Sequence, residues 1–109
     1  MNDRQPDLSE RVALTIIEVV ESFLEVKETI IFGSRALGNA KDGSDIDLCL
    51  KGEEINSRII SKIYTILNEE TNLPYFIDIV HYETITNKEL KKHIDQFGII
   101  ISKPAIKRN

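Results

Sequence analysis

The N-terminal part of the chain has apolar residues on one face of a helix. They recur at intervals of three or four positions: Leu8, Val12, Ile16, Val19 and Phe23. Ser9 stands near the start of this segment and is a residue type that caps helix N-termini. The first seven residues are polar and include a proline, so we expect them to be flexible. The pattern predicts an amphipathic helix that begins close to Ser9.

Short apolar runs bounded by turn-forming residues predict four strands. The first covers residues 28–32, and a polar loop over 39–44 carries the chain to the second, near 45–51. The third is expected at 75–80, and the Ile-Ile-Ile run at 99–101 is a candidate for the fourth. Each run is short enough for a strand of a small sheet.

Two further amphipathic segments separate the later strands. From residue 53 to about 71 the apolar positions again have helical spacing: Ile55, Ile59, Ile63, Ile66 and Leu67. Thr86 can cap another helix that runs through about Gln96. The resulting order α, β, β, α, β, α, β predicts an α/β (α+β) protein with a small mixed sheet and helices packed against it. We expect one domain over 1–109, with a flexible tail at 103–109.

Composition limits the classes of function. The chain has 109 residues, of which 41% are hydrophobic, so there is room for one core and one site. Its net charge of −4 argues against a surface that neutralises a nucleic-acid backbone, and direct nucleic-acid binding is not expected. Cys49 is the single cysteine and cannot form an internal disulfide. Because neither a signal peptide nor an apolar stretch of membrane length is present, we expect a cytoplasmic protein without a membrane partner.

Two carboxylates mark the start of the second predicted strand. Asp45 and Asp47 are two positions apart, so a strand would point both to the same face. At about 5 Å and an effective dielectric of about 20, two such charges repel by roughly 3 kcal/mol. A cation between them would relieve this repulsion, and Mg²⁺ is the natural candidate because it binds carboxylates together with substrate phosphates. The alternative is a solvated strand end.

The Gly33-Ser34 pair ends the first predicted strand and begins a short helical turn. Glycine allows close approach to the main chain, and the Ser34 hydroxyl and amide can both donate to a phosphate oxygen. The alternative is an ordinary strand-to-helix turn. Arg35 is either a further phosphate contact or a surface residue of the turn, which Gly38 is expected to end. Together with the carboxylates, the turn predicts a site for a nucleoside triphosphate.

This arrangement resembles a known family signature. Gly33-Ser34, Gly38 and Ser44-Asp45-Ile46-Asp47 match the G-S-x-x-x-G and S-D-x-D motifs of the polymerase β-like nucleotidyltransferase superfamily. The resemblance covers roughly residues 28 to 80. Because the chain is short, it is most similar to the minimal nucleotidyltransferases, the MntA-type antitoxins.

The resemblance implies a polymerase β palm-like nucleotidyltransferase fold and a third catalytic carboxylate. Asp78 matches it and lies in the apolar run Tyr-Phe-Ile-Asp-Ile-Val, where a charge is costly unless it is paired or metal-bound. Asp45, Asp47 and Asp78 would then hold two Mg²⁺ ions, with ATP as substrate, and Asp78 would also help to deprotonate the attacking hydroxyl. Ser44 would brace the loop, with substrate contact as the lesser alternative. The implied nucleotide-binding residues are Gly33, Ser34, Arg35, Gly38 and Ser44.

The same resemblance implies a partner. An MntA-type antitoxin would transfer AMP from ATP to a tyrosine hydroxyl near the ribonuclease site of a HEPN-domain toxin. One alternative is transfer to a small-molecule hydroxyl, and another is an antitoxin that acts by binding and occlusion without catalysis. Exposed apolar surface would support a homo-oligomer or a hetero-oligomer with the toxin.

Other residues receive structural interpretations. Cys49 shares the face of the aspartates and is expected to be a small buried residue, whereas Leu48 and Leu50 point to the opposite face and into the core. His81 and His93 have no histidine or cysteine partner at metal-ligand spacing, so both are expected to be structural or solvated.

Overall fold

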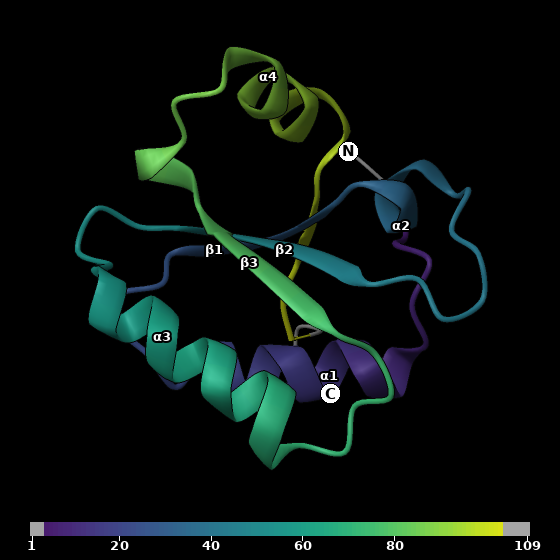
Figure 1. Cartoon of the computed structure of the whole chain (residues 1–109), viewed down its shortest axis with the longest axis horizontal. Helices are drawn as coiled ribbons and strands as arrows, with labels where there is room; N and C mark the ends of the chain where they lie inside the picture. The colour runs from purple at the N-terminus through teal and green to yellow at the C-terminus, as the bar shows by residue number, and fades with distance from the viewer. Residues whose placement is uncertain (1–3, 104–109) are drawn as a thin grey trace, which may run out of the picture.

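A mixed four-stranded sheet lies between helices on both of its faces (Figure 1). The computed structural model describes residues 4–103. The strand order is β3-β2-β1-β4, with β1 antiparallel to both β2 and β4, and β2 parallel to β3. The strands are β1 (Glu28–Phe32), β2 (Ile46–Lys51), β3 (Ile77–His81) and β4 (Ile99–Ile101). The predicted α+β class and mixed sheet are confirmed.

The helices divide between the two faces of the sheet. In Figure 1, α1 and α3 lie below the sheet and α4 lies above it. The helices are α1 (Glu10–Val20), α2 (Ser34–Leu37), α3 (Ser57–Thr65) and α4 (Lys88–Phe97). A π-helical turn, η1 (Ile66–Glu70), continues α3, and a 3₁₀ turn, η2 (Tyr82–Thr84), follows β3. Among residues 4–103, none of these helices has the length and apolar character needed to cross a membrane.

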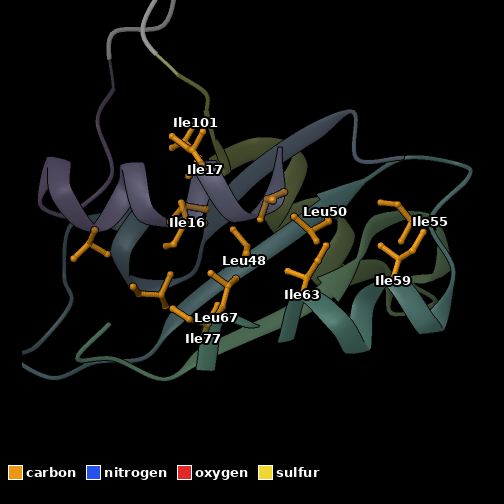
Figure 2. Close-up of a cluster of buried hydrophobic side chains, with 14 residues drawn as sticks. Ile16, Ile17, Leu48, Leu50, Ile55, Ile59, Ile63, Leu67, Ile77 and Ile101 are labelled. Carbon is orange, nitrogen blue, oxygen red and sulfur yellow. The ribbon is translucent and has the colours of Figure 1, made fainter. Parts of the chain in front are cut away.

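The larger hydrophobic core lies between the sheet and the helices α1 and α3 (Figure 2). Leu48 and Leu50 of β2 are fully buried in it, which confirms their predicted orientation. Isoleucine dominates this core, and β-branched side chains suit a pleated surface. Its buried members are Val12, Ile16, Ile17, Val20, Ile31, Ile46, Leu48, Leu50, Ile55, Ile59, Ile63, Leu67, Ile77 and Ile101.

A smaller core lies on the opposite face, beneath α4. It consists of Ile30, Phe32, Cys49 and Ile94. Burial raises the pKa of the Cys49 thiol to about 12, so the side chain is neutral at physiological pH. Cys49 is therefore the small buried residue that the sequence predicts, and its face of the sheet is the one covered by α4.

Capping side chains set where the helices begin. The Ser9 side chain accepts the Val12 N–H, as predicted. The predicted start of α3 at residue 53 is wrong, because Asn56 caps the helix by accepting the Ile59 N–H. Thr86 is likewise not the cap of α4; the neighbouring Asn87 accepts the Leu90 N–H instead.

The N-terminal segment differs in part from its prediction. Residues 1–3 and 104–109 lie outside the described part of the chain. Residues 4–7, which were expected to be flexible, are tied to the body of the protein. Arg4 donates to the Ala36 carbonyl at 2.8 Å, and the Asp7 N–H donates to the Arg35 carbonyl at 2.7 Å. Contacts with residues distant in the sequence therefore keep this segment in place, although its composition favours disorder.

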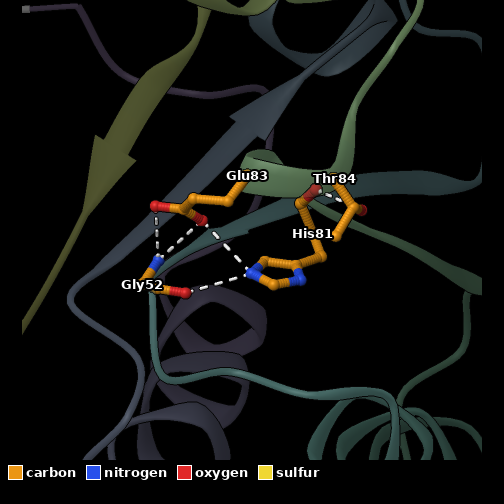
Figure 3. A network of polar contacts seen from close by, with 4 residues as sticks. All are labelled: Gly52, His81, Glu83 and Thr84. Carbon is orange, nitrogen blue, oxygen red and sulfur yellow. Dashed lines mark hydrogen bonds and ion pairs between the residues drawn. The ribbon is translucent and has the colours of Figure 1, made fainter.

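His81 has a structural role at the end of β3 (Figure 3). Its Nε2 atom lies 3.0 Å from the Gly52 carbonyl and 3.2 Å from the Glu83 carboxylate. The same carboxylate accepts the Gly52 N–H at 3.0 Å. These contacts hold the turn after β2 against the end of β3, in agreement with the predicted structural interpretation of His81.

Asn68 completes the outer edge of β3. Its side-chain amide donates to the Ile77 carbonyl at 3.0 Å and its carbonyl accepts the Ile77 N–H at 2.8 Å. One side chain thus replaces the hydrogen bonds that a further strand would make. Asn68 lies within the π-helical turn that continues α3, a geometry found often at functional sites. It fixes the residue that immediately precedes Asp78.

Replacing Asn68 should destabilise the protein measurably. In Asn68→Ala both polar groups of the buried residue Ile77 lose their partner, so we expect the free energy of unfolding to fall by about 1–3 kcal/mol. Urea unfolding measures this loss. Asn72→Ala is the control, because Asn72 is exposed and its side chain makes no hydrogen bond within residues 4–103. Equal losses in both variants would contradict the role of Asn68.

Candidate active site

Three aspartates meet at one end of the sheet. Asp47 of β2 is in register with Asp78 of β3 on one side and with Phe32 of β1 on the other. Residues paired across neighbouring strands share a face, and such strands are about 4.8 Å apart. Asp45 precedes β2 and is two positions from Asp47, so it belongs to the same face. The structure thus brings together the three carboxylates singled out in the sequence, on the face covered by α4.

Among residues 4–103, the three carboxylates form no ion pair with a lysine or an arginine. Burial is the main cause that raises the pKa of Asp47, followed by the nearby carboxylates of Asp78 and Asp45, whereas His93 lowers it. Asp45 and Asp78 are exposed and Asp47 is partly buried. In the described part of the chain, neither ion pair involves any of the three aspartates. The fold therefore holds like charges close together, which lowers its stability.

The chemistry of these ligands fits a hard cation. Carboxylate oxygens are the protein ligands that Mg²⁺ prefers, and a divalent ion would remove the repulsion around Asp47. Over residues 4–103, however, no three His, Cys, Asp or Glu side chains lie close enough together to hold a metal ion in their present conformations. Asp45 and Asp78 are exposed, so their side chains can rotate toward Asp47 without disturbing the core.

The Gly33-Ser34 turn lies directly against Asp47. Gly33 precedes α2 with a φ angle of 74°, a left-handed conformation that favours glycine. A Cβ atom at this position would collide with the Asp47 Oδ2 atom. Gly38 ends α2 in the left-handed conformation at φ 81°, as expected from the sequence. Glycine at position 33 therefore allows the turn and the carboxylate to approach closely.

Arg35 is buried, although the sequence suggested a surface residue or a phosphate contact. Only 6% of it is exposed, and its guanidinium donates to the carbonyls of Asp7 and Ser44, each at 2.7 Å. A weaker contact at 3.4 Å reaches the Asp45 carbonyl, and the guanidinium carbon lies 4.4 Å from the centre of the Tyr75 ring. The predicted surface position is wrong because main-chain carbonyls hold the charge inside. Arg35 fixes the backbone that carries Asp45.

Ser44 braces the loop before Asp45. Its hydroxyl accepts the Lys41 N–H at 2.9 Å, and its own N–H donates to the Lys41 carbonyl at 3.0 Å. These two bonds close a tight turn at the end of the 39–44 loop. The arrangement agrees with the bracing role expected for this serine.

His93 has the structural role that the sequence analysis allowed, but its position beside Gly33 was not predicted. The Gly33 N–H donates to its Nε2 atom at 3.0 Å, across 60 positions of sequence. The ring also makes an edge contact with Phe32, with centroids 6.1 Å apart. A signal was present in the sequence, because helical spacing places His93 on the apolar face of α4 with Leu90, Ile94 and Phe97. A solvated histidine would not be expected on that face.

The family follows from comparison of the sequence with known proteins. The model of the family "Polymerase beta, Nucleotidyltransferase" matches residues 15–105. The chain therefore belongs to the polymerase β nucleotidyltransferase family, which confirms the resemblance seen in its motifs. Among curated protein sequences, none matches the chain.

Solved structures share the fold at low sequence identity. A chain in a crystal structure of a toxin–antitoxin with AMP-PNP has a TM-score of 0.65 at 17% identity, with 85% of this chain and 72% of the other covered. A chain in a structure of tri-AMPylated Shewanella oneidensis HEPN toxin in complex with MNT antitoxin has a TM-score of 0.65 at 15% identity, covering 85% and 71%. A putative nucleotidyltransferase from Sulfolobus solfataricus has a TM-score of 0.53 at 24% identity, covering 83% and 76%.

A pair of glycine substitutions tests the close approach of the turn to Asp47. Gly33 and Gly43 both have positive φ angles, 74° and 79°, but the space around Gly43 is open. Alanine should cost about 1–3 kcal/mol of backbone strain at either position, because both have a positive φ angle. We expect Gly33→Ala to lower the free energy of unfolding by at least about 1 kcal/mol more, because overpacking displaces Asp47. Urea unfolding compares the two, and equal losses would contradict the close packing.

Proposed function

We propose that this protein is a magnesium-dependent nucleotidyltransferase that transfers AMP from ATP to a hydroxyl group of a partner HEPN-domain toxin and thereby neutralises it. The observation that carries the proposal is the group of three aspartates beside the Gly33-Ser34 turn, in a chain of the polymerase β nucleotidyltransferase family. We place the reaction in the cytoplasm, where ATP is available.

The site residues have distinct roles in this proposal. Asp45, Asp47 and Asp78 hold two Mg²⁺ ions, which supply charge neutralisation at the α-phosphate and the departing pyrophosphate. Gly33 permits close approach of the nucleotide, and Ser34 donates to its terminal phosphates. The Ser34 hydroxyl makes no hydrogen bond within residues 4–103, so it is free for this role. Gly38 and Ser44 shape the two sides of the nucleotide site.

Arg35 contributes indirectly. Its guanidinium donates to the main-chain carbonyls of Asp7 and Ser44. We therefore assign Arg35 a positioning role in place of the phosphate contact. It sets the main chain at Ser44 and Asp45, and through them the first carboxylate of the site.

The transfer is a substitution at the α-phosphorus of ATP. The acceptor oxygen forms a bond to that phosphorus, and the bond between the phosphorus and the bridging oxygen of pyrophosphate breaks. The acceptor proton passes to a carboxylate, and the exposed position of Asp78 suits this task. The products are an AMP ester of the acceptor and free pyrophosphate.

The proposed acceptor is a tyrosine hydroxyl of the HEPN toxin. Two neighbouring structures support a HEPN toxin as the acceptor protein, one a toxin–antitoxin with AMP-PNP and the other a tri-AMPylated HEPN toxin with its MNT antitoxin. The tyrosine is the part of the proposal that rests on the family resemblance. Exposed large side chains, including Tyr64 and Phe76, which contact each other edge to face, offer apolar surface for a partner. The assembly would then be a hetero-oligomer of toxin and antitoxin.

Intact mass spectrometry of the partner tests the proposal. A purified HEPN-domain protein is incubated with this chain, ATP and Mg²⁺, and we expect mass gains in whole AMP units. Asp45→Asn should reduce the rate by about 100-fold or more, because a charged group that stabilises the transition state is lost. Asp42→Asn, which removes an exposed carboxylate of the preceding loop, is the control and should transfer AMP normally.

Two outcomes would contradict this function. A partner that binds tightly and is neutralised without gaining mass would indicate an antitoxin that acts by occlusion. A partner that is ignored, while an aminoglycoside-like small molecule with free hydroxyls gains AMP, would indicate a small-molecule nucleotidyltransferase.

A further inference from the structure

The contact between His93 and Gly33 joins two elements that are far apart in sequence. His93 lies in α4, and its Nε2 atom accepts the N–H of Gly33 at the point where β1 ends. The backbone N–H can only donate, so Nε2 is the acceptor in this contact. The imidazole therefore occupies the one hydrogen-bond donor of the Gly33 main chain.

Packing holds the ring in the orientation that this hydrogen bond needs. Phe32 meets it edge on at an interplanar angle of 73°, and Phe97 packs on it with centroids 5.5 Å apart. Phe32 immediately precedes Gly33, so the ring contact and the hydrogen bond reach adjacent residues of the same strand end. Such packing leaves the side chain few alternative rotamers.

The helix that carries His93 is itself tied to the site. The Tyr82 hydroxyl donates to the Asp95 carboxylate at 2.7 Å, which fastens α4 to the turn after β3. Arg4 donates to the carbonyls of Ala36 in α2 and Phe97 in α4, at 2.8 Å and 3.0 Å. The distance between α4 and the Gly33-Ser34 turn is thus set by several contacts, of which the hydrogen bond of His93 is the one nearest Asp47.

We propose that His93 is a positioning residue of the nucleotidyl-transfer site, which holds the Gly33 amide and so sets the register of the nucleotide phosphates on Ser34 relative to Asp47. The inference rests on the proposed function. With its N–H engaged by His93, Gly33 cannot serve as a phosphate donor, and the phosphates are directed to Ser34. The Asp47 carboxylate packs against the other side of Gly33, so the same glycine relates the phosphates to the carboxylate.

Two substitutions separate the hydrogen bond from the packing. His93→Phe keeps an aromatic ring between Phe32 and Phe97 but removes the acceptor. His93→Gln places an amide oxygen near the position of Nε2 but removes the ring. If the hydrogen bond is what matters, His93→Gln keeps AMP transfer and His93→Phe loses it. If only the packing of the ring matters, His93→Phe keeps AMP transfer and His93→Gln loses it.

The kinetic readout is AMP transfer to the HEPN partner as a function of ATP concentration. In His93→Phe the freed Gly33 N–H competes with Ser34 for phosphate, so the nucleotide still binds but its α-phosphate is misplaced. We expect kcat to fall about tenfold while KM for ATP changes less, a loss typical of one hydrogen bond left unmade. His93→Gln should keep kcat within about threefold of wild type. Unchanged kcat in His93→Phe, or equal losses in both variants, would overturn the proposal.

A second measurement, by NMR spectroscopy, does not depend on AMP transfer. The chain has five glycines, so the Gly33 amide can be assigned in a ¹⁵N-labelled sample. Its hydrogen exchange should be slow in wild type and His93→Gln and faster in His93→Phe. Addition of ATP and Mg²⁺ should shift the Ser34 amide in wild type, and both the Gly33 and Ser34 amides in His93→Phe.

The two readouts separate failure of this inference from failure of the proposed function. If wild type binds ATP with the expected shifts but modifies no HEPN protein, the proposed acceptor is wrong and the role of His93 stands. If wild type transfers AMP but Gly33 exchange is the same in His93→Phe, the role of His93 is wrong and the function stands. Absence of ATP binding by wild type would overturn both.

Discussion

The electrostatic repulsion around Asp47 is the constraint on which the rest of the site depends. The parallel pairing of β2 and β3 places Asp78 directly beside Asp47, and Asp45 belongs to the same face. Burial is the main cause that raises the pKa of Asp47, and the carboxylates of Asp78 and Asp45 raise it further. A fold has no structural reason to gather like charges in this way. A cation that carries phosphates would make the arrangement favourable, as the proposed function requires.

Several contacts hold the backbone so that this repulsion cannot relax by moving the strands. Asn68 fixes the residue before Asp78, and Arg35 binds the carbonyls on either side of the bond between Ser44 and Asp45. His93 fixes Gly33, which packs against Asp47 itself. Each of these residues acts on the main chain next to one of the three carboxylates or next to the Gly33-Ser34 turn. The charged side chains can rotate, but the positions from which they extend are set by the fold.

Local patterns in the sequence were sufficient to predict the order of the elements and to single out Asp45 and Asp47, whereas Asp78 was added through the family resemblance. The alternation of side chains along a strand correctly predicted that Leu48 and Leu50 face the core. Asp78 was recognisable because it is a charged residue within an apolar run. Helix starts were less predictable, because Asn56 and Asn87 compete with neighbouring residues for the capping position. A pattern shows that a helix is present more clearly than it shows which polar side chain caps it.

The contacts between distant segments could not be predicted from local pattern. Arg35 has the composition of a surface residue, and its burial depends on three carbonyls and an aromatic ring supplied by other parts of the chain. His93 likewise meets Gly33 only because α4 folds back over the sheet. Both residues form hydrogen bonds with main-chain groups beside the site, and these bonds become visible only in the tertiary structure.

Thermal unfolding with and without Mg²⁺ tests most directly whether the site is built around a cation. At neutral pH and at about 100 times its dissociation constant, Mg²⁺ should stabilise the wild-type protein by about 2.7 kcal/mol and raise its Tm accordingly. Asp47→Asn should already be more stable than wild type without metal, because the repulsion is relieved, and Mg²⁺ should no longer raise its Tm. An equal rise of Tm with Mg²⁺ in both proteins would contradict the account.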